Sequence, residues 1–285
     1  MTVTDTRTIP MQNSSVPDAR GPEAPKTQGA RRYVYCLIDG DEPSGFGPMG
    51  IEAGVEVVTI HHEGISAVVS DTATEKFDIS RGNALAHQRV MEAAMQRGHT
   101  VLPVRFNTIA EGKGLGTAQQ RVIDHVLIGR GEEVRGLLSE MSGLVELGVK
   151  GLWTNVASQF QEIAEGNPEI FALRKKLLAA KGSPNVPAQM KLGEKVKEAL
   201  EARKGEREAA VVACLAAQTT DLKKNKTFGD PMFANLAILV DKARQAEVEA
   251  ALTDYESRYQ GQVKMRCVGP LPPCNFLELV ITWDD

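Results

Sequence analysis

The sequence has no surplus of positive charge and few aromatic side chains. Its 285 residues include 33 Lys and Arg against 37 Asp and Glu, which gives a net charge of −4, and aromatic residues make up 5%. Proteins that bind nucleic acid usually carry a basic surplus or stripe, and single-strand binders add aromatic side chains on which bases stack. We therefore expect no nucleic-acid partner.

Long apolar runs are missing as well. No stretch approaches the about 18–20 apolar residues that a membrane-spanning helix needs. The N-terminal sequence MTVTDTRTIPMQNSS has no apolar run after its charges, so we expect no secretory signal and no membrane association. The cysteines are then expected to be reduced thiols of a cytoplasmic protein. They are Cys36, Cys214, Cys267 and Cys274.

Signatures of metal, phosphate and catalytic sites do not occur. The Cys267-x6-Cys274 spacing differs from a zinc knuckle and has no second pair. The glycine-rich segment 111–117 lacks both the GxxxxGK[ST] and the GxGxxG spacing, and neither GxSxG nor HExxH is present. His87 lies on the apolar face of a predicted helix, where a hydrogen-bonded core histidine is commoner than a catalytic one. We expect no catalytic residue, no cofactor and no metal, and hence no enzyme.

The first half of the chain predicts a disordered tail followed by a mixed domain. Residues 1–30 are rich in Pro, Thr and Ser with almost no apolar pattern, which favours disorder. Residues 31–141 alternate apolar strand-like runs with segments of helical period, and we predict an N-terminal α+β domain there. Its expected strands are 33–38, 55–60, 65–70 and 101–106, and its expected helices are 80–97, one capped by Thr117, and 132–141.

The second half, residues 142–285, predicts a modified ferredoxin-like domain. A strand at 144–150 precedes a long helical segment, 152–217, and a polar edge strand at 219–225 precedes the apolar central strand 233–241. A helix over 243–259 and strands at 262–268 and 276–283 complete the order β–α–β–β–α–β, with a proline-containing break before the last strand. The fold class is therefore α+β with two domains and an extended helical insertion.

RNA-recognition domains share this strand order, but their reading strand carries aromatic side chains that stack on bases. The central candidate strand here, FANLAILVD at 233–241, offers aliphatic side chains instead. The order of elements therefore does not predict RNA binding.

Three stretches together resemble the gas vesicle protein F/L family. They are the strands at 33–36 and 67–70, the His87 helix followed by TVLPVRF at 100–106, and the pair NLAILV at 235–240 and VGPLPPCNF at 268–276. The resemblance spans residues 32–283. It departs at Asn107, where members usually have Gly, and at Cys274, where they often have an aromatic residue. The matching positions are His87, Pro103, Arg105, Phe106, Gly269, Pro270, Pro272, Pro273 and Phe276.

The resemblance implies a non-enzymatic accessory or minor structural protein of gas vesicle formation. It implies association with gas vesicles in the cytoplasm and binding to the hydrophobic shell protein and to other accessory proteins. We expect the matching residues to shape the fold more than to touch a partner, since Pro fixes φ, Gly permits bends and Phe fills a core. Arg105 is the exception to test, because a cation beside a buried strand needs a carboxylate or carbonyl partner.

Two other functions stay open at this stage. A small-molecule enzyme could use a cleft between the domains, which predicts a deep pocket with converging polar groups and a displaced pKa. A general protein-assembly scaffold unrelated to vesicles would have the same kinds of surface.

Overall fold

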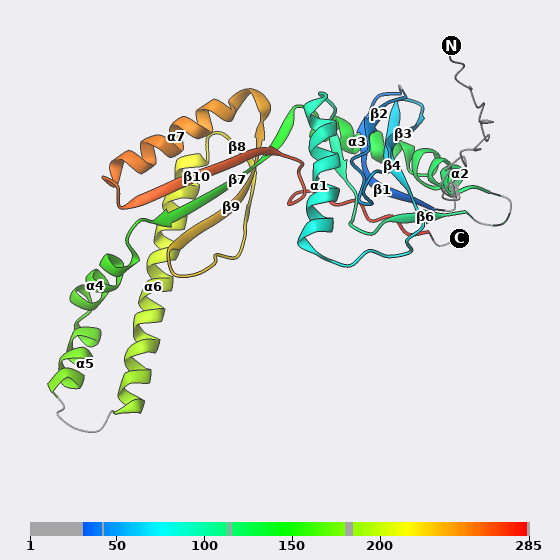
Figure 1. The fold of residues 1–285 in the computed structure, drawn as a ribbon. Helices are drawn as coiled ribbons and strands as arrows, with labels where there is room; N and C mark the ends of the chain where they lie inside the picture. The colour runs from blue at the N-terminus through cyan, green and yellow to red at the C-terminus, as the bar shows by residue number, and fades with distance from the viewer. Residues whose placement is uncertain (1–30, 42, 113, 115, 180–184, 284–285) are drawn as a thin grey trace, which may run out of the picture.

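Two antiparallel sheets with helices packed on them form the computed structural model, which describes residues 31–283 except 42, 113, 115 and 180–184 (Figure 1). The predicted disordered tail, residues 1–30, lies outside the described residues, as does part of the glycine-rich segment 111–117. The mixture of helices and sheets confirms the α+β class. The division of the chain at residue 141 stays a prediction; the strands of one sheet come from residues 31–111 and those of the other from 144–271.

The first sheet is organised around β1, whose apolar run is buried on both faces. The strand order is β2-β3-β4-β1-β5, and β6 also pairs with β1. Glu63 and Gly64 both have positive φ, 46° and 81°, and close the predicted hairpin between β3 and β4 with a two-residue turn. The strands are β1 Arg31–Asp39, β2 Gly45–Gly47, β3 Val57–His62, β4 Ile65–Thr72, β5 Val101–Pro103 and β6 Ile109–Glu111.

Helices cover both faces of this sheet. Ser80 caps α1 (Arg81–Gln96) by accepting a hydrogen bond from the Asn83 N–H, and Gly98 with φ of 93° follows the helix end. The α1 helix packs on the face that carries Tyr33 and Tyr35. The opposite face of β1 packs against α2 (Ala118–Val122), a π-helix (Ile123–Ile128) and α3 (Gly131–Met141).

The second sheet has the order β10-β7-β9-β8, with β8 at one edge. The chain follows the predicted β–α–β–β–α–β order, and the helices share one core with one face of the sheet. Figure 1 shows α4, α5 and α6 extending well beyond the sheet. The strands are β7 Leu144–Trp153, β8 Thr219–Lys224, β9 Met232–Asp241 and β10 Val263–Leu271. The helices are α4 Val156–Gly166, α5 Pro168–Ala179, α6 Val186–Leu215 and α7 Gln245–Arg258, which follows a short 3₁₀ turn, Lys242–Arg244.

Three sequence-based boundaries are wrong. The strand expected at 101–106 ends at Pro103, because the chain turns where Asn107 adopts a φ of 67°. Trp153 ends β7 instead of starting a helix, and the expected helical segment 152–217 is divided into α4, α5 and α6. The expected strand at 276–283 is not a strand of the second sheet: this segment lies against the first sheet, where Leu279 forms a parallel bridge with Val104.

Gly269 lies within β10, at the irregularity in its pairing with β7 between Val268 and Leu271. Its φ is 151°, and a Cβ there would lie 2.5 Å from Leu147 Cδ2 and 3.0 Å from the Glu146 carbonyl oxygen. Any other residue at this position would therefore have an unfavourable φ, and its side chain would also collide with β7.

We predict that Gly269→Ala lowers the free energy of unfolding by about 2–3 kcal/mol, because strain and overpacking add. Urea unfolding measures this change. Gly205→Ala is the matched control: a Cβ there meets nothing within 4 Å in the exposed middle of α6, so it should stabilise by about 0.5–1 kcal/mol. Equal effects of both substitutions would contradict this role of Gly269.

Candidate functional site

The segment from Gly269 to Trp283, here called the crossing segment, runs from the second sheet to the first. It contains the second group of family-motif residues, and its later residues Glu278 and Leu279 contact the first group. The Leu279 N–H donates to the Pro103 carbonyl oxygen at 2.8 Å, and the Arg105 N–H donates to the Leu279 carbonyl oxygen at 3.0 Å. The Leu279 side chain is buried in the core of the first sheet. The end of the chain is thus bonded to the motif that follows α1.

Arg105 has the partner that a cation beside a buried strand requires. Its Nε lies 3.2 Å from Glu278 Oε2, and both side chains are about half exposed. An ion pair so open to solvent contributes little stability. The Arg105 guanidinium therefore remains accessible to solvent, and whether it contacts a partner stays a prediction.

A second anchor holds the crossing segment to the second sheet. Glu146 of β7 is buried, and its carboxylate accepts hydrogen bonds from the Asn275 backbone N–H at 2.8 Å and from Asn275 Nδ2 at 2.6 Å. Burial raises the pKa of Glu146, and the two bonds from Asn275 oppose that rise. One amide residue therefore satisfies both oxygens of a buried carboxylate.

His87 lies in a buried aromatic cluster with Tyr33, Tyr35 and Phe106. Its Nε2 is 3.2 Å from the Val104 carbonyl oxygen, which can only accept, so Nε2 carries the proton. Its Nδ1, 3.0 Å from the Tyr33 hydroxyl, then accepts from that group. Burial lowers the pKa of His87 to about 4, so the ring is neutral at pH 7. This is the geometry of a hydrogen-bonded core histidine.

Asn107, one of the two departures from the family pattern, occupies a position that suits Gly or Asn. Its φ of 67° lies in the left-handed region, which Asn tolerates better than most residues. Its side chain also accepts from the Phe77 N–H at 2.8 Å and donates to the Phe77 carbonyl oxygen at 2.8 Å, and its N–H donates to the Tyr33 hydroxyl. Asn107 therefore keeps the turn that a Gly would allow and adds two side-chain hydrogen bonds to the backbone of Phe77.

A groove of about 500 Å³ lies between the two sheets, beside the crossing segment. Gly269, Pro270 and Pro273 line one side, and α1 and the start of β5 line the other. Its polar lining includes Glu92, His99 and Lys242; the residues with displaced pKa values described above, His87 and Glu146, are not in its lining. Pro103, Pro272 and Phe276 also lie outside it. Phe276 instead has the ammonium of Lys223, on β8, 5.6 Å from its ring centre.

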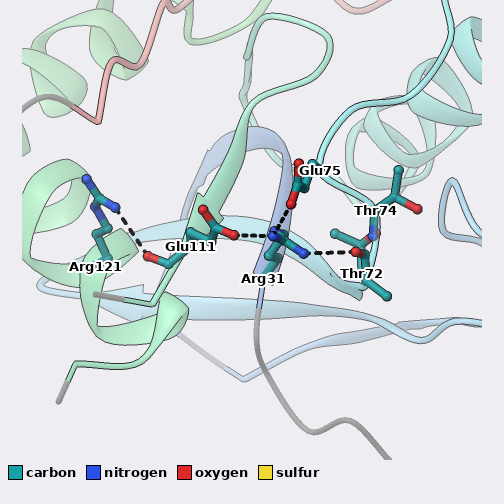
Figure 2. Close-up of polar contacts among 7 residues, drawn as sticks. Arg31, Thr72, Thr74, Glu75, Glu111 and Arg121 are labelled. Atoms are coloured by element: carbon teal, nitrogen blue, oxygen red, sulfur yellow. Dashed lines mark hydrogen bonds and ion pairs between the residues drawn. The ribbon is translucent and has the colours of Figure 1, made fainter. Parts of the chain in front are cut away.

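The start of the first sheet is held by a network of charged side chains (Figure 2). The Arg31 guanidinium donates to the Ala73 carbonyl oxygen at 3.0 Å and pairs with Glu75 at 2.7 Å and with Glu111. Arg121 donates to the Glu111 carbonyl oxygen at 3.3 Å and also to the carbonyl oxygen of Trp283, at the end of the crossing segment. The network therefore connects both ends of the described chain.

Residues 31–278 match the sequence family described as gas vesicle synthesis protein GvpL/GvpF. The chain belongs to this family. Gas vesicle protein F of a Streptomyces species is 29% identical over 247 residues, which cover 86% of this chain and 99% of the relative. Gas vesicle protein F2 of Halobacterium salinarum is 24% identical over 254 residues, covering 87% and 93%.

The solved structures agree on the fold. The crystal structure of GvpF from Anabaena sp. superimposes with a TM-score of 0.73 at 18% identity, covering 88% of this chain and 99% of that one. The crystal structure of GvpF from Microcystis aeruginosa gives a TM-score of 0.68 at 21% identity, covering 88% and 100%.

Family membership confirms the resemblance found in the sequence and makes this chain a protein of gas vesicle formation. The family consists of structural and accessory proteins and is not a known enzyme family. Among the described residues, no helix is long and apolar enough to cross a membrane. The roles assigned to the nine family-motif residues stay predictions.

Two residues that matter here were missed in the sequence. Glu146 alternates with Val145 and Leu147 as a solvent-facing residue of a half-buried strand would, so nothing in the pattern indicates its burial. Asn275 lies inside the quoted PPCNF motif, but its partner is 129 residues away. Only a contact prediction could have paired them.

We predict that stability falls as the pH is lowered from about 6.5 to about 4, because the unfolded His87 takes up a proton that the folded one resists. Within that window the loss reaches about 3 kcal/mol. Urea unfolding of wild type and His87→Gln at several pH values isolates this contribution, since Gln does not titrate. Parallel pH profiles for the two proteins would contradict the assignment.

We also predict that Asn275→Ala lowers the free energy of unfolding by about 1–3 kcal/mol, because the buried Glu146 carboxylate loses a donor. In a Glu146→Gln background the same substitution should cost less, since no buried charge is then left underbonded. A double-mutant cycle measured by urea unfolding tests this, and an equal cost in both backgrounds would show that the two residues are not coupled.

Proposed function

We propose that this gas vesicle protein binds the hydrophobic shell protein through the free edge of its second sheet, together with other accessory proteins, and so aids nucleation or assembly. A shell subunit exposes apolar, strand-forming surface before it is assembled. Such surface aggregates unless another strand pairs with it or covers it. Addition of a strand to an existing sheet supplies that cover through backbone hydrogen bonds. The family and the edge strand β8 together support this mechanism.

The direction of the β8 backbone groups identifies the donors available to such a partner. The Asn225 N–H donates to the Asn235 carbonyl oxygen at 2.7 Å, so it points toward β9. Because backbone groups alternate along an antiparallel ladder, the N–H groups of Leu222 and Lys224 point away from β9. The Leu222 N–H instead donates to Asp221 Oδ1 at 2.7 Å.

The edge is also guarded against pairing with copies of itself. Asp221 occupies one outward donor, and Lys223 places positive charge on the strand, whereas the Lys224 ammonium pairs with Glu208 of α6 at 2.7 Å. Charged side chains of this kind are a common protection of exposed sheet edges. A partner strand without positive charge can still approach, so the edge favours a different protein over a second copy.

Lys224→Pro is the substitution that tests the proposal, because it removes an outward N–H without removing a bond to β9. We predict about tenfold weaker binding of the purified protein to solubilised shell protein, the effect of losing about 1.4 kcal/mol. Lys224→Ala keeps the N–H and removes the side chain, so it should bind within about twofold of wild type. Thermal unfolding verifies that both variants are folded.

Asp221→Ala supplies a test in the opposite direction. It frees the Leu222 N–H and should tighten binding to the shell protein by a few-fold. Unchanged affinity in both Lys224→Pro and Asp221→Ala would contradict strand addition at β8, and absence of any binding by the wild-type protein would contradict the proposed function itself.

A further inference from the structure

The helices inserted between β7 and β8 form an arm that extends beyond the core of the second sheet (Figure 1). We define the arm as residues 171–179 of α5 and 186–199 of α6. No described residue between Ile170 and Leu200 is buried, whereas both of those residues are. The arm therefore contributes no fully buried side chain, although Leu192, Val196 and Ala199 are partly buried and pack against the core of the second sheet.

Ion pairs fix how the two helices of the arm lie against each other. Glu169 of α5 pairs with Lys195 of α6 at 3.4 Å, and Glu162 of the preceding helix α4 pairs with Arg203, later in α6. The helices are therefore antiparallel. Continuing the same register toward the tip places Leu178 level with Val186, and Arg174 level with Met190.

Four large apolar side chains are exposed on this arm. Leu178 is 77% exposed, Met190 63%, Val186 53% and Phe171 52%. We call these four residues the arm patch. Phe171 and Leu178 are seven residues apart on α5, and Val186 and Met190 are four apart on α6, so each pair forms a stripe along its helix.

The two stripes lie on the same side of the arm. On α5, Ile170, Leu173 and Leu177 form the more buried face. Phe171 comes directly after Ile170 and Leu178 directly after Leu177, so both are rotated by one residue from that face. On α6, Val186 and Met190 are rotated in the same sense from the more buried Val196 and Leu200. Because the helices are antiparallel, the same rotation leads to the same face. The patch extends about 10 Å along the arm, which is two turns of helix.

The charge on the arm is predominantly positive: Glu194 and Glu198 stand against Arg174, Lys175, Lys176, Lys191, Lys195 and Lys197. The sequence from Ile170 to Gly193 has no Asp or Glu, and its Lys and Arg residues are Arg174, Lys175, Lys176, Lys181 and Lys191. Within the described part of the chain, Arg174, Lys175, Lys176 and Lys191 are exposed and have no acidic partner. The positive charge of the arm contrasts with the net charge of −4 of the whole protein.

From this combination we infer that the arm patch binds an acidic amphipathic helix of a partner protein, which lies along α5 and α6 as a third helix. Two antiparallel helices with apolar stripes on one side form a groove for a helix with apolar residues at i, i+3, i+4 and i+7. Acidic residues beside that stripe match the basic residues of the arm. The inference rests on the proposed function only in taking the partner to be another vesicle protein.

Other occupants fit less well. A second copy of the chain would bring together two arms that each carry a surplus of positive charge, and like charges repel. A membrane surface would match the basic and apolar character, but interfacial helices commonly use Trp or Tyr, and the sequence has neither between Trp153 and Tyr255. A membrane is therefore kept as an outcome of the test.

The test measures binding of two fluorescein-labelled synthetic peptides of about 18 residues to the full-length protein by fluorescence anisotropy. Both have Leu at i, i+3, i+4 and i+7; one has Glu at the remaining positions, and the other has Lys. We expect the Glu peptide to bind at least about tenfold more tightly than the Lys peptide, with an affinity that falls as salt is raised. Leu178→Ser/Met190→Ser should weaken it by at least about tenfold.

Ile79→Ser/Phe228→Ser is the matched control, because these side chains are 89% and 68% exposed elsewhere on the protein. It should bind the Glu peptide as wild type does. Equal binding of the two peptides, or of wild type and the Leu178→Ser/Met190→Ser variant, would overturn the inference. So would patch-dependent binding to phosphatidylglycerol vesicles without peptide binding. Lys224→Pro should leave peptide affinity unchanged, so failure of strand addition at β8 is distinguishable from failure at the arm.

Discussion

The hydrogen bonds between Leu279 and the backbone of Pro103 and Arg105 hold the two sheets of this protein together at the end of the chain. The crossing segment begins at Gly269, where a side chain would collide with Leu147 and with the Glu146 carbonyl oxygen. Asn275 then fixes the middle of the segment to the buried Glu146. A carboxylate in that position without Asn275 would be a buried charge lacking donors, so the crossing segment and β7 stabilise one another.

This arrangement explains where the family-motif residues lie. The Pro103–Phe106 motif contacts Leu279, near the end of the crossing segment, and the glycine and prolines at 269–273 lie at its start, where Gly269, Pro270 and Pro273 line the groove. His87 of α1 contacts the first motif: its Nε2 donates to the Val104 carbonyl oxygen, and its ring packs edge-on against the Phe106 ring. The arm lies away from these motif positions, whereas Phe276 lies beside Lys223 of the β8 edge. That the motif residues shape the fold more than they touch a partner stays a prediction.

The sequence predicted local structure well and distant contacts poorly. The hairpin at Glu63-Gly64, the cap at Ser80 and the edge position of β8 all follow from residues close in the chain, because turn residues, capping side chains and polar strands act locally. The segment 276–283 alternates as a strand does, but which sheet it joins depends on Leu279 meeting Val104, 175 residues earlier. The pairing of Asn275 with Glu146 could not be predicted for the same reason, because 129 residues separate them. The arm patch was missed for another reason: helical period indicates an apolar face, but not whether anything in the same chain covers it.

Amide hydrogen exchange of the full-length protein, with and without solubilised shell protein, tests the central claim most directly. Strand addition at β8 predicts that the amides of Leu222 and Lys224 exchange more slowly when shell protein is present, while those of Lys223 and Asn225, which already face β9, change little. Slower exchange confined to other segments, with Leu222 and Lys224 unchanged, would contradict the account.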